Sequence, residues 1–129
     1  MAAIVELDAD ECRALLSEHN FGRVGFVSDD VPVILPVNYV LDGNTIVFRT
    51  DPGLKLAEVP MRHVAFEIDA ANGSDMWSVL IQGFAREITD ALGTRYESYR
   101  ELAIPVQAPG NKDYWVAVEI ERISGRRIH

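Results

Sequence analysis

The chain has 129 residues, of which 48% are hydrophobic and 25% are charged. This length is sufficient for a domain with a buried core, and we predict a single domain over residues 1–129. The formal net charge is −8. Nucleic acids and anionic membrane surfaces require a basic face, so we expect neither as a partner. Local clusters of cations are instead compatible with a small anionic ligand.

Residues 1–7 lack the basic start and apolar stretch of a signal peptide, and the sequence contains no long apolar run. We therefore expect a cytoplasmic location. The single cysteine, Cys12, cannot form an internal disulfide, which fits a reducing compartment. Because Cys12 falls on the apolar stripe of a predicted helix, we expect it to be a buried packing residue.

The first predicted element is a helix over residues 8–19. Asp8 is a good N-cap, and Glu11 completes the pattern of a capping box. Such a helix is expected to cover one end of a barrel. A strand at residues 23–28 follows, and Asp29-Asp30 is typical of a turn.

Residues 31–55 form the central part of the chain. Apolar residues occupy every second position of the next predicted strand, which places them on one face: Val33, Leu35, Val37, Tyr39 and Leu41. A turn at residues 42–44, in which Gly43 adopts a positive φ, leads to a strand at 45–50. Pro36 cannot donate to a ladder, so it predicts an edge or bulge where a ligand can meet backbone groups.

The rest of the chain continues this alternation of strands and turns. We predict a short helix at 54–61, a strand at 63–69, a flexible loop at 70–75, a long strand at 77–88, a helix at 90–102, a loop at 104–113, a last strand at 114–123 and a tail at 124–129. Gly83 in the long strand indicates a bend or the close approach of another backbone. The predicted fold is mainly β with a few helices: a six-stranded antiparallel barrel.

One stretch offers groups for binding an anion. Arg49 and Lys55 are cations, Thr50 supplies a hydroxyl, and a helix start near Leu54 exposes backbone N–H groups. Together they can hold one phosphate. The same stretch is also typical of an ordinary strand-to-helix turn with two solvated cations, and the local sequence alone favours that interpretation.

No catalytic constellation of the usual kind is visible, and the catalytic residues stay unassigned. His19, His63 and His129 lack the spacing of metal ligands, so no metal site is expected. The sequence has no glycine-rich dinucleotide fingerprint, no phosphate loop and no nucleophile turn. An enzyme without its own acid, base or nucleophile commonly takes its chemistry from a cofactor.

Several stretches together resemble the pyridoxamine 5′-phosphate oxidase-like family, the FMN-binding split β-barrel group. Residues 36–39, the Asp42-Gly43 turn and residues 48–55 resemble its flavin-binding hairpin. Residues 77–87 resemble its later long strand, and residues 115–126 resemble its last strand and tail. The resemblance implies a split barrel of the FMN-binding type, and a homodimer with the flavin site at the interface.

The resemblance also implies cofactor-binding residues. These are Pro36, Val37, Asn38, Arg49, Thr50, Lys55, Trp77, Ser78, Gln82 and Trp115. Arg49, Thr50 and Lys55 match positions around the phosphate, and the strand at 33–38 matches the one along the flavin ring. The long-strand residues match positions near the ring or ribityl chain, and Trp115 reaches the partner's cofactor. Core or interface packing explains the two tryptophans equally well, and Gln82 can instead satisfy a neighbouring backbone group.

The sequence departs from the family pattern in two places. The stretch after Thr50 carries an acid, Asp51, and Lys55 as its one cation, and residues 125–129 lack the family's substrate-binding Arg/His ending. Pyridoxal phosphate synthesis is therefore not expected, and the tail resembles shorter, nitroimidazole-reductase-like members. The implied function is an FMN-binding oxidoreductase that transfers a hydride or electrons to a small organic acceptor. Alternatives are a deazaflavin-dependent reductase, a non-catalytic flavin- or haem-binding module, and a small barrel unrelated to flavin.

Overall fold

The computed structural model describes residues 3–50, 61–88 and 114–129, without the side chains of Thr50 and Tyr114. The helix predicted at 90–102 and the loop at 104–113 lie outside these residues. The helix predicted at 54–61 lies outside them except for Met61, and the candidate residue Lys55 lies outside them as well.

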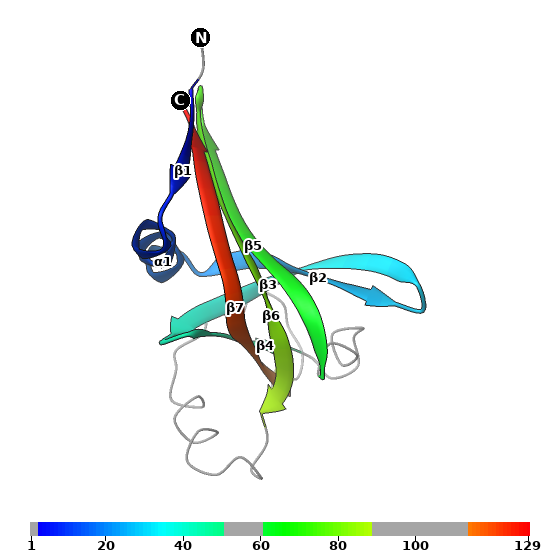
Figure 1. Ribbon diagram of the computed structural model, residues 1–129. Helices are drawn as coiled ribbons and strands as arrows, with labels where there is room; N and C mark the ends of the chain where they lie inside the picture. The colour runs from blue at the N-terminus through cyan, green and yellow to red at the C-terminus, as the bar shows by residue number, and fades with distance from the viewer. Residues whose placement is uncertain (1–2, 51–60, 89–113) are drawn as a thin grey trace.

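Within the described residues the chain forms one helix and seven strands (Figure 1). They are β1 (Ile4–Leu7), α1 (Ala9–Glu18), β2 (Phe21–Ser28), β3 (Val31–Asp42), β4 (Thr45–Thr50), β5 (Arg62–Asn72), β6 (Asp75–Ile88) and β7 (Tyr114–Ile128). All six predicted strands are confirmed. The sequence analysis missed β1 and the continuation of β7 through the predicted tail. These segments pair with each other from opposite ends of the chain, with Ile4 opposite Ile128, so no local pattern reveals them.

The strands form an antiparallel sheet in the order β1-β7-β4-β3-β2-β5-β6, and an additional pairing of β7 with β6 joins six of them into a ring. The predicted six-stranded barrel is therefore confirmed, with β1 added alongside β7. The two chain ends meet there, since Ala3 and His129 exchange backbone hydrogen bonds of 2.8 and 3.1 Å. No described helix has the length and apolar character required to cross a membrane.

The inner face of the barrel holds the main core. Alternate residues of β3 pack into it, which confirms the single apolar face predicted for that strand. The rings of Tyr39 and Phe66 meet edge to face with centroids 4.9 Å apart, a favourable aromatic geometry. The Tyr39 hydroxyl donates to the carbonyl of Leu16 at 2.7 Å and so joins α1 to the core.

Helix α1 begins as the sequence predicts. The Glu11 N–H donates to the Asp8 carboxylate at 2.8 Å, and the Asp8 N–H donates to the Glu11 side chain at 3.2 Å, which completes the capping box. Cys12 and Leu16 are buried against the barrel. The predicted packing role of Cys12 is therefore confirmed, and burial raises the pKa of its thiol.

The hairpin turns depend on residues with positive φ. Gly43 has a φ of 60°, as predicted, and Asp29 and Asp30 have φ values of 51° and 64°. The prediction of a flexible loop at 70–75 is wrong. β5 and β6 instead continue to a tight turn in which Asn72 pairs with Asp75 and Gly73 has a φ of 64°. The Asn-Gly dipeptide that suggested a loop is equally a signal for a two-residue hairpin.

Two parts of the sheet extend beyond the barrel (Figure 1). The β2–β3 hairpin projects to one side and is called the arm below. The ends of β5, β6 and β7 continue together with β1 in another direction. Within the described residues Pro36 lies where β3 pairs only with β2, which confirms its predicted edge position. A Cβ on Gly83 would lie 2.2 Å from the Glu119 carbonyl oxygen, which confirms the predicted close backbone approach.

Candidate functional site

Strand β3 changes partners in the middle of its length. Its ladder with β4 ends at the pair Tyr39 and Phe48, and its ladder with β2 begins at the pair Asn38 and Phe21. From Asn38 towards the N-terminal end of β3, the described residues provide no strand that pairs with the β4-facing edge of β3. We call this place the strand fork, formed by residues 36–38 of β3 and 49–50 of β4. An unpaired strand edge presents backbone N–H and C=O groups that a ligand can bind.

The predicted β3 residues at the strand fork point in different directions. Pro36 is exposed, whereas Val37 is buried in the core and pairs with Gly22 of β2. The Asn38 amide donates to the Asn20 carbonyl at 3.2 Å, and the Tyr39 N–H donates to the same oxygen at 3.0 Å. These bonds fix the fork to the segment that joins α1 and β2.

Arg49 and Trp115 face each other on the outer side of the barrel wall. They are register partners of β4 and β7, and the guanidinium carbon of Arg49 lies 5.2 Å from the centre of the indole ring. This is a cation–π contact. Trp115 is only 4% exposed and packs with Val47, Ile88 and Ala117 in a second apolar cluster. The half-buried Arg49 therefore rests on a fixed ring at the strand fork.

The three residues of β6 that were predicted to bind the cofactor lie away from the strand fork. Trp77 is opposite Arg127 of β7, twelve residues beyond Trp115, which corresponds to about 40 Å along the strand. Its ring packs against the His19 ring with centroids 4.9 Å apart. Ser78 and Gln82 occupy the alternating, outer positions. A single chain thus brings Arg49 and Trp115 together but does not bring the β6 residues to the strand fork.

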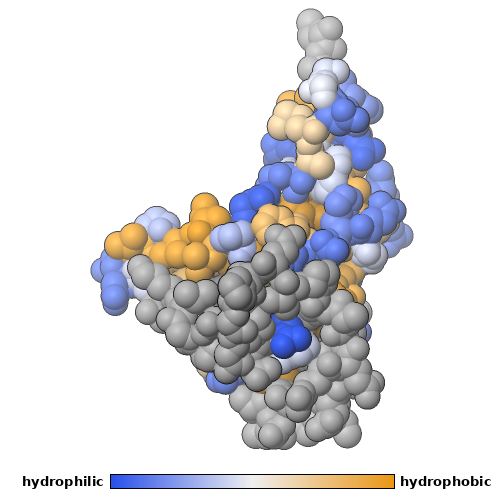
Figure 2. All heavy atoms as spheres, turned by 180° about the vertical axis from the view of Figure 1, so that it is seen from behind, coloured by the Kyte–Doolittle hydropathy of each residue, from blue (hydrophilic) through white to orange (hydrophobic). Residues whose placement is uncertain are grey.

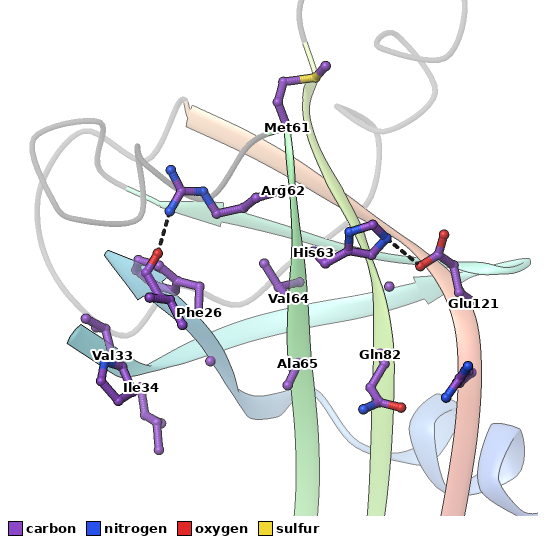
Figure 3. Close-up of a pocket in the computed structure, with 15 residues that line it drawn as sticks. Phe26, Val33, Ile34, Met61, Arg62, His63, Val64, Ala65, Gln82 and Glu121 are labelled. Carbon is purple, nitrogen blue, oxygen red and sulfur yellow. Dashed lines mark hydrogen bonds and ion pairs between the residues drawn. The ribbon is translucent and has the colours of Figure 1, made fainter. Parts of the chain in front are cut away.

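A groove of about 810 Å³ lies on the outer face between the arm and the barrel (Figure 3). One row of register partners crosses it from β3 to β7: Ile34, Gly25, Ala65, Gln82 and Arg122. The two residues in the middle of this row carry no side chain or only a methyl group. The floor of the groove is therefore flat and shallow, with longer side chains at both ends.

A β-bulge supplies one wall of the groove. Gln82 pairs with Arg122 but Gly83 pairs with Ile120, so Glu121 is an extra residue on β7. A bulge re-aims the side chains beside it. The Glu121 carboxylate lies 3.1 Å from Nε2 of His63, and Figure 3 shows the pair along the side of the groove.

The opposite side of the groove is held by Arg62. Its guanidinium donates to the Val27 carbonyl of the arm at 2.6 Å, and the N–H of the preceding Met61 donates to the Ala85 carbonyl at 2.6 Å. These bonds connect the start of β5 with both the arm and β6. They fix the angle between the arm and the barrel, and hence the width of the groove.

The next register row beside the groove contains an ionic cluster. Arg23 pairs with Glu67 and lies 2.8 Å from the Asp69 carboxylate. Burial and a hydrogen bond with Asp69 raise the pKa of Glu67, whereas the same bond with Glu67 and the charge of Arg23 lower the pKa of Asp69. Glu67 is therefore the first of the two carboxyls to take up a proton as the pH falls.

The sequence analysis missed the groove. It considered His63 only as a metal ligand, and it assigned no role to Gly25, Ala65, Glu121 or Arg122. Gly25 within a predicted strand was the one visible signal, since strand glycines often mark a close approach of another group. Among the described residues no group of three His, Cys, Asp or Glu side chains is placed to hold a metal ion.

Comparison with known proteins identifies the family to which this chain belongs. The family model for pyridoxamine 5′-phosphate oxidase matches residues 8–127. An uncharacterised protein of Mycobacterium tuberculosis is 31% identical over 134 residues, which cover 97% of this chain and 86% of that protein.

Two solved structures have the same fold. The FAD-binding protein of Mycobacterium smegmatis is 31% identical with a TM-score of 0.83, and the match covers 95% of this chain and 97% of that one. A conserved protein of unknown function from Corynebacterium diphtheriae is 28% identical with a TM-score of 0.80, over 95% and 96% of the two chains. The resemblance found in the sequence is therefore confirmed, and the chain belongs to the pyridoxamine 5′-phosphate oxidase family and has its split-barrel fold.

Proposed function

We propose that this chain is a flavin-binding oxidoreductase that passes a hydride or electrons to a small organic acceptor. The sequence favours FMN, and the related protein of Mycobacterium smegmatis is an FAD-binding protein. FMN and FAD share the flavin ring, the ribityl chain and the phosphate next to it. The observation that carries the proposal is the strand fork, where Arg49 rests on Trp115 beside an unpaired edge of β3.

The described residues suit a flavin phosphate. A guanidinium binds phosphate through two parallel charge-assisted hydrogen bonds, and the Trp115 ring limits the directions that Arg49 can take. Thr50 follows Arg49 and contributes a hydroxyl in this proposal, while Lys55 lies outside the described residues. Among the described residues no strand pairs with the β4-facing edge of β3 at Pro36 and Asn38, so backbone groups there can meet the polar edge of the ring. A bound flavin supplies the redox chemistry, and these residues hold and orient it.

The proposal includes a homodimer. Large apolar side chains are exposed on the arm and near the groove: Val27, Val31, Ile34, Met61 and Leu80. Figure 2 shows apolar residues gathered on the projecting arm. A symmetric partner would cover such a surface. It would also offer a route for Trp77, Ser78 and Gln82 of one chain to reach the flavin of the other. Sedimentation equilibrium at micromolar concentration should give a dimer, and a monomer would contradict this part of the proposal.

The first test is an absorbance spectrum of the purified protein followed by fluorescence titrations with FMN, FAD and a deazaflavin coenzyme. We expect saturable flavin binding at micromolar concentration or below. Arg49→Gln should weaken FMN binding about 10- to 100-fold, because a hydrogen bond to a charged group contributes about 1.5–3 kcal/mol. The matched control is Arg86→Gln, which removes an exposed arginine that pairs with Glu119 on β7 at 3.7 Å.

Each other outcome has a defined meaning. Tighter binding of the deazaflavin would replace the proposal with a deazaflavin-dependent reductase. A bound flavin that no organic acceptor reoxidises faster than oxygen does would indicate a non-catalytic flavin-binding module. If neither flavin binds, the proposed function is wrong, and haem becomes the next ligand to titrate.

A further inference from the structure

The arm ends in a turn that exposes two acidic side chains. Asp29 and Asp30 join the paired residues Ser28 and Val31, with φ values of 51° and 64°. Two positive φ values are the type I′ geometry, for which Asn-Gly and Asp-Gly are preferred pairs. Both aspartates are exposed, and within the described part of the chain neither has a hydrogen-bond or ion-pair partner. The arm therefore ends in two free carboxylates.

The strands behind this tip are apolar on the side that faces the groove. Val27 is 56% exposed and Ile34 is 70% exposed, and both line the groove. Figure 2 shows apolar residues gathered on the projecting arm. Large apolar side chains are unfavourable in contact with water, so we expect another protein surface to cover this one. The arm thus combines an apolar side with an acidic tip.

The far side of the groove carries the opposite charge. The row of register partners that crosses the groove ends at Arg122 on β7. Arg122 is exposed, and among the described residues its guanidinium has no hydrogen-bond or ion-pair partner. The neighbouring acid, Glu121, is engaged with His63 at 3.1 Å. The groove therefore has an apolar wall and a free cation, which are complementary to the side and the tip of an arm.

The floor of the groove is open at a position where packing within the chain does not require it. A Cβ on Gly25 would have its nearest neighbours at 3.8–4.0 Å, which is ordinary van der Waals contact. Gly22 and Gly83 differ, because a Cβ on either would lie within 2.7 Å of a carbonyl oxygen. Gly25 keeps the floor flat, so that a strand can lie on it.

The dimensions of the arm and the groove match. From Gly25 to Asp30 the arm extends about 17 Å, at about 3.4 Å per residue of a strand. From Ile34 to Arg122 the row crosses four spacings between strands, which is about 19 Å. In Figure 1 the arm runs across the direction of β5 and β6, as this row does. An arm laid along the groove would therefore bring its tip to Arg122.

We propose that two copies of the chain clasp each other, with the arm of each copy lying in the groove of the other. The arm of the same chain cannot fill this space, because it forms one wall of the groove. In the clasp the Asp29-Asp30 turn meets Arg122 of the partner subunit, and the apolar sides of the two arms meet each other. Each copy offers both surfaces, so the contact is symmetric and closes as a dimer.

This contact rests on the homodimer of the proposed function and identifies the groups that hold it together. The groove is filled by the partner and is not a separate ligand site. Gln82 lies next to Arg122 in the row, so the clasp places it beside β3 of the partner. That strand carries the partner's strand fork, which agrees with the proposed route of Gln82 to the partner's flavin.

The test measures the dissociation constant of the dimer by sedimentation equilibrium of the full chain at several salt concentrations. Asp29→Asn combined with Asp30→Gly removes both carboxylates but keeps a preferred type I′ pair, so the circular dichroism spectrum should stay that of the parent. The dissociation constant should rise about 10-fold, because a symmetric dimer loses two copies of the ion pair. Salt should weaken the parent dimer more than the dimer of this variant.

Arg122→Gln tests the other side of the ion pair. It should raise the dissociation constant to a similar extent, and adding it to the turn variant should change little, since both remove the same contact. Arg126→Gln is the matched control, because it changes an exposed arginine of β7 that does not line the groove. It should leave the dimer unchanged. Gly25→Leu places a side chain on the floor and should weaken the dimer without changing the circular dichroism spectrum.

Several results would overturn the proposal. These are a turn variant that dimerises as tightly as the parent, effects of the turn variant and Arg122→Gln that add in full, or weakening by Arg126→Gln in place of Arg122→Gln. The proposed function fails separately. A dimer with the expected coupling that binds no flavin would leave the clasp intact, whereas a monomer that binds FMN would remove the clasp and leave the flavin site at the strand fork.

Discussion

The strand fork and the groove lie on the same outer surface but are built differently. The fork comes from one hairpin, so its residues lie within fifteen positions of sequence, from Pro36 to Thr50. The groove needs one row across five strands, from Ile34 on β3 to Arg122 on β7. A site within one hairpin can be inferred from local spacing, whereas a site made by sheet register requires the structure.

The two arginines of these sites also differ in their support. Arg49 is half-buried and rests on the Trp115 ring, which is 4% exposed. Arg122 is exposed and stands beside the His63–Glu121 pair. A side chain that is already fixed loses less conformational entropy when a ligand binds. Arg49 is therefore better prepared to bind an anion than Arg122 is.

The largest expected effect on stability distinguishes Gly83 from Gly25, the two glycines of the groove region. Gly83→Ala would place a Cβ 2.2 Å from the Glu119 carbonyl oxygen, which must move and disturb the β-bulge. Overpacking of this kind costs about 2–3 kcal/mol of unfolding free energy. Gly25→Ala is the matched control and should change stability by less than about 0.5 kcal/mol. Urea unfolding measures both, and equal losses would refute the distinction between a structural and an open glycine.

The next effect concerns the core behind the strand fork. Tyr39→Phe removes the hydrogen bond to the buried Leu16 carbonyl and should cost about 1–2 kcal/mol. FMN affinity should stay unchanged, since the Tyr39 side chain points away from the outer surface. If flavin binding fell together with stability, the fork would depend on the core more than the geometry indicates.

The pH dependence of the same variant provides a second measurement. Burial raises the pKa of Tyr39 above the unfolded value of about 10. The folded state therefore holds this proton more tightly, and the resulting stabilisation is complete below pH 10 and is lost as the pH rises towards the folded-state pKa. Unfolding measured between pH 8 and 11, a range about the unfolded pKa, should show a steeper loss of stability in the parent than in Tyr39→Phe. Parallel curves would contradict the assignment.

The smallest expected effect tests the wall of the groove. His63 and Glu121 have side chains that are 72% and 50% exposed, and exposed pairs contribute little to stability. Glu121→Gln should change the unfolding free energy by less than about 0.5 kcal/mol. A loss as large as that of Gly83→Ala would mean that the His63–Glu121 pair also holds the bulge in place.

Much of the barrel can be predicted from the sequence, because the alternation of residues within a strand indicates which of its faces is buried. The alternation of Val33, Leu35 and Val37 and the capping box at Asp8 and Glu11 are local signals, and both are confirmed. The pairing of β1 with the end of β7 is a contact between chain ends and leaves no local trace. The same holds for the row through Gly25 and Ala65, because register between distant strands is set by the whole sheet. The tight turn at Gly73 was predicted to be part of a flexible loop, because the Asn-Gly dipeptide is common in loops and in hairpins.

The predicted site residues also divide into those that are close in sequence and those that depend on contacts between distant segments. The local chemistry of the sequence indicated Arg49, Thr50 and Lys55, and the family resemblance supplied the others. The structure brings Trp115 to Arg49 by strand register. Trp77, Ser78 and Gln82 match family positions but lie far along β6 from the fork. A sequence cannot distinguish residues that meet within one chain from residues that meet only in a pair of chains.

The most direct test of the central claim compares FMN with riboflavin, which lacks the phosphate. The ratio of the two dissociation constants should be at least about tenfold in the parent, because the charged partner of the phosphate is present. In Arg49→Gln the ratio should fall by about tenfold or more, while riboflavin affinity changes little. An unchanged ratio in Arg49→Gln would show that the phosphate does not pair with Arg49, and the strand fork would then have to be abandoned as the flavin site.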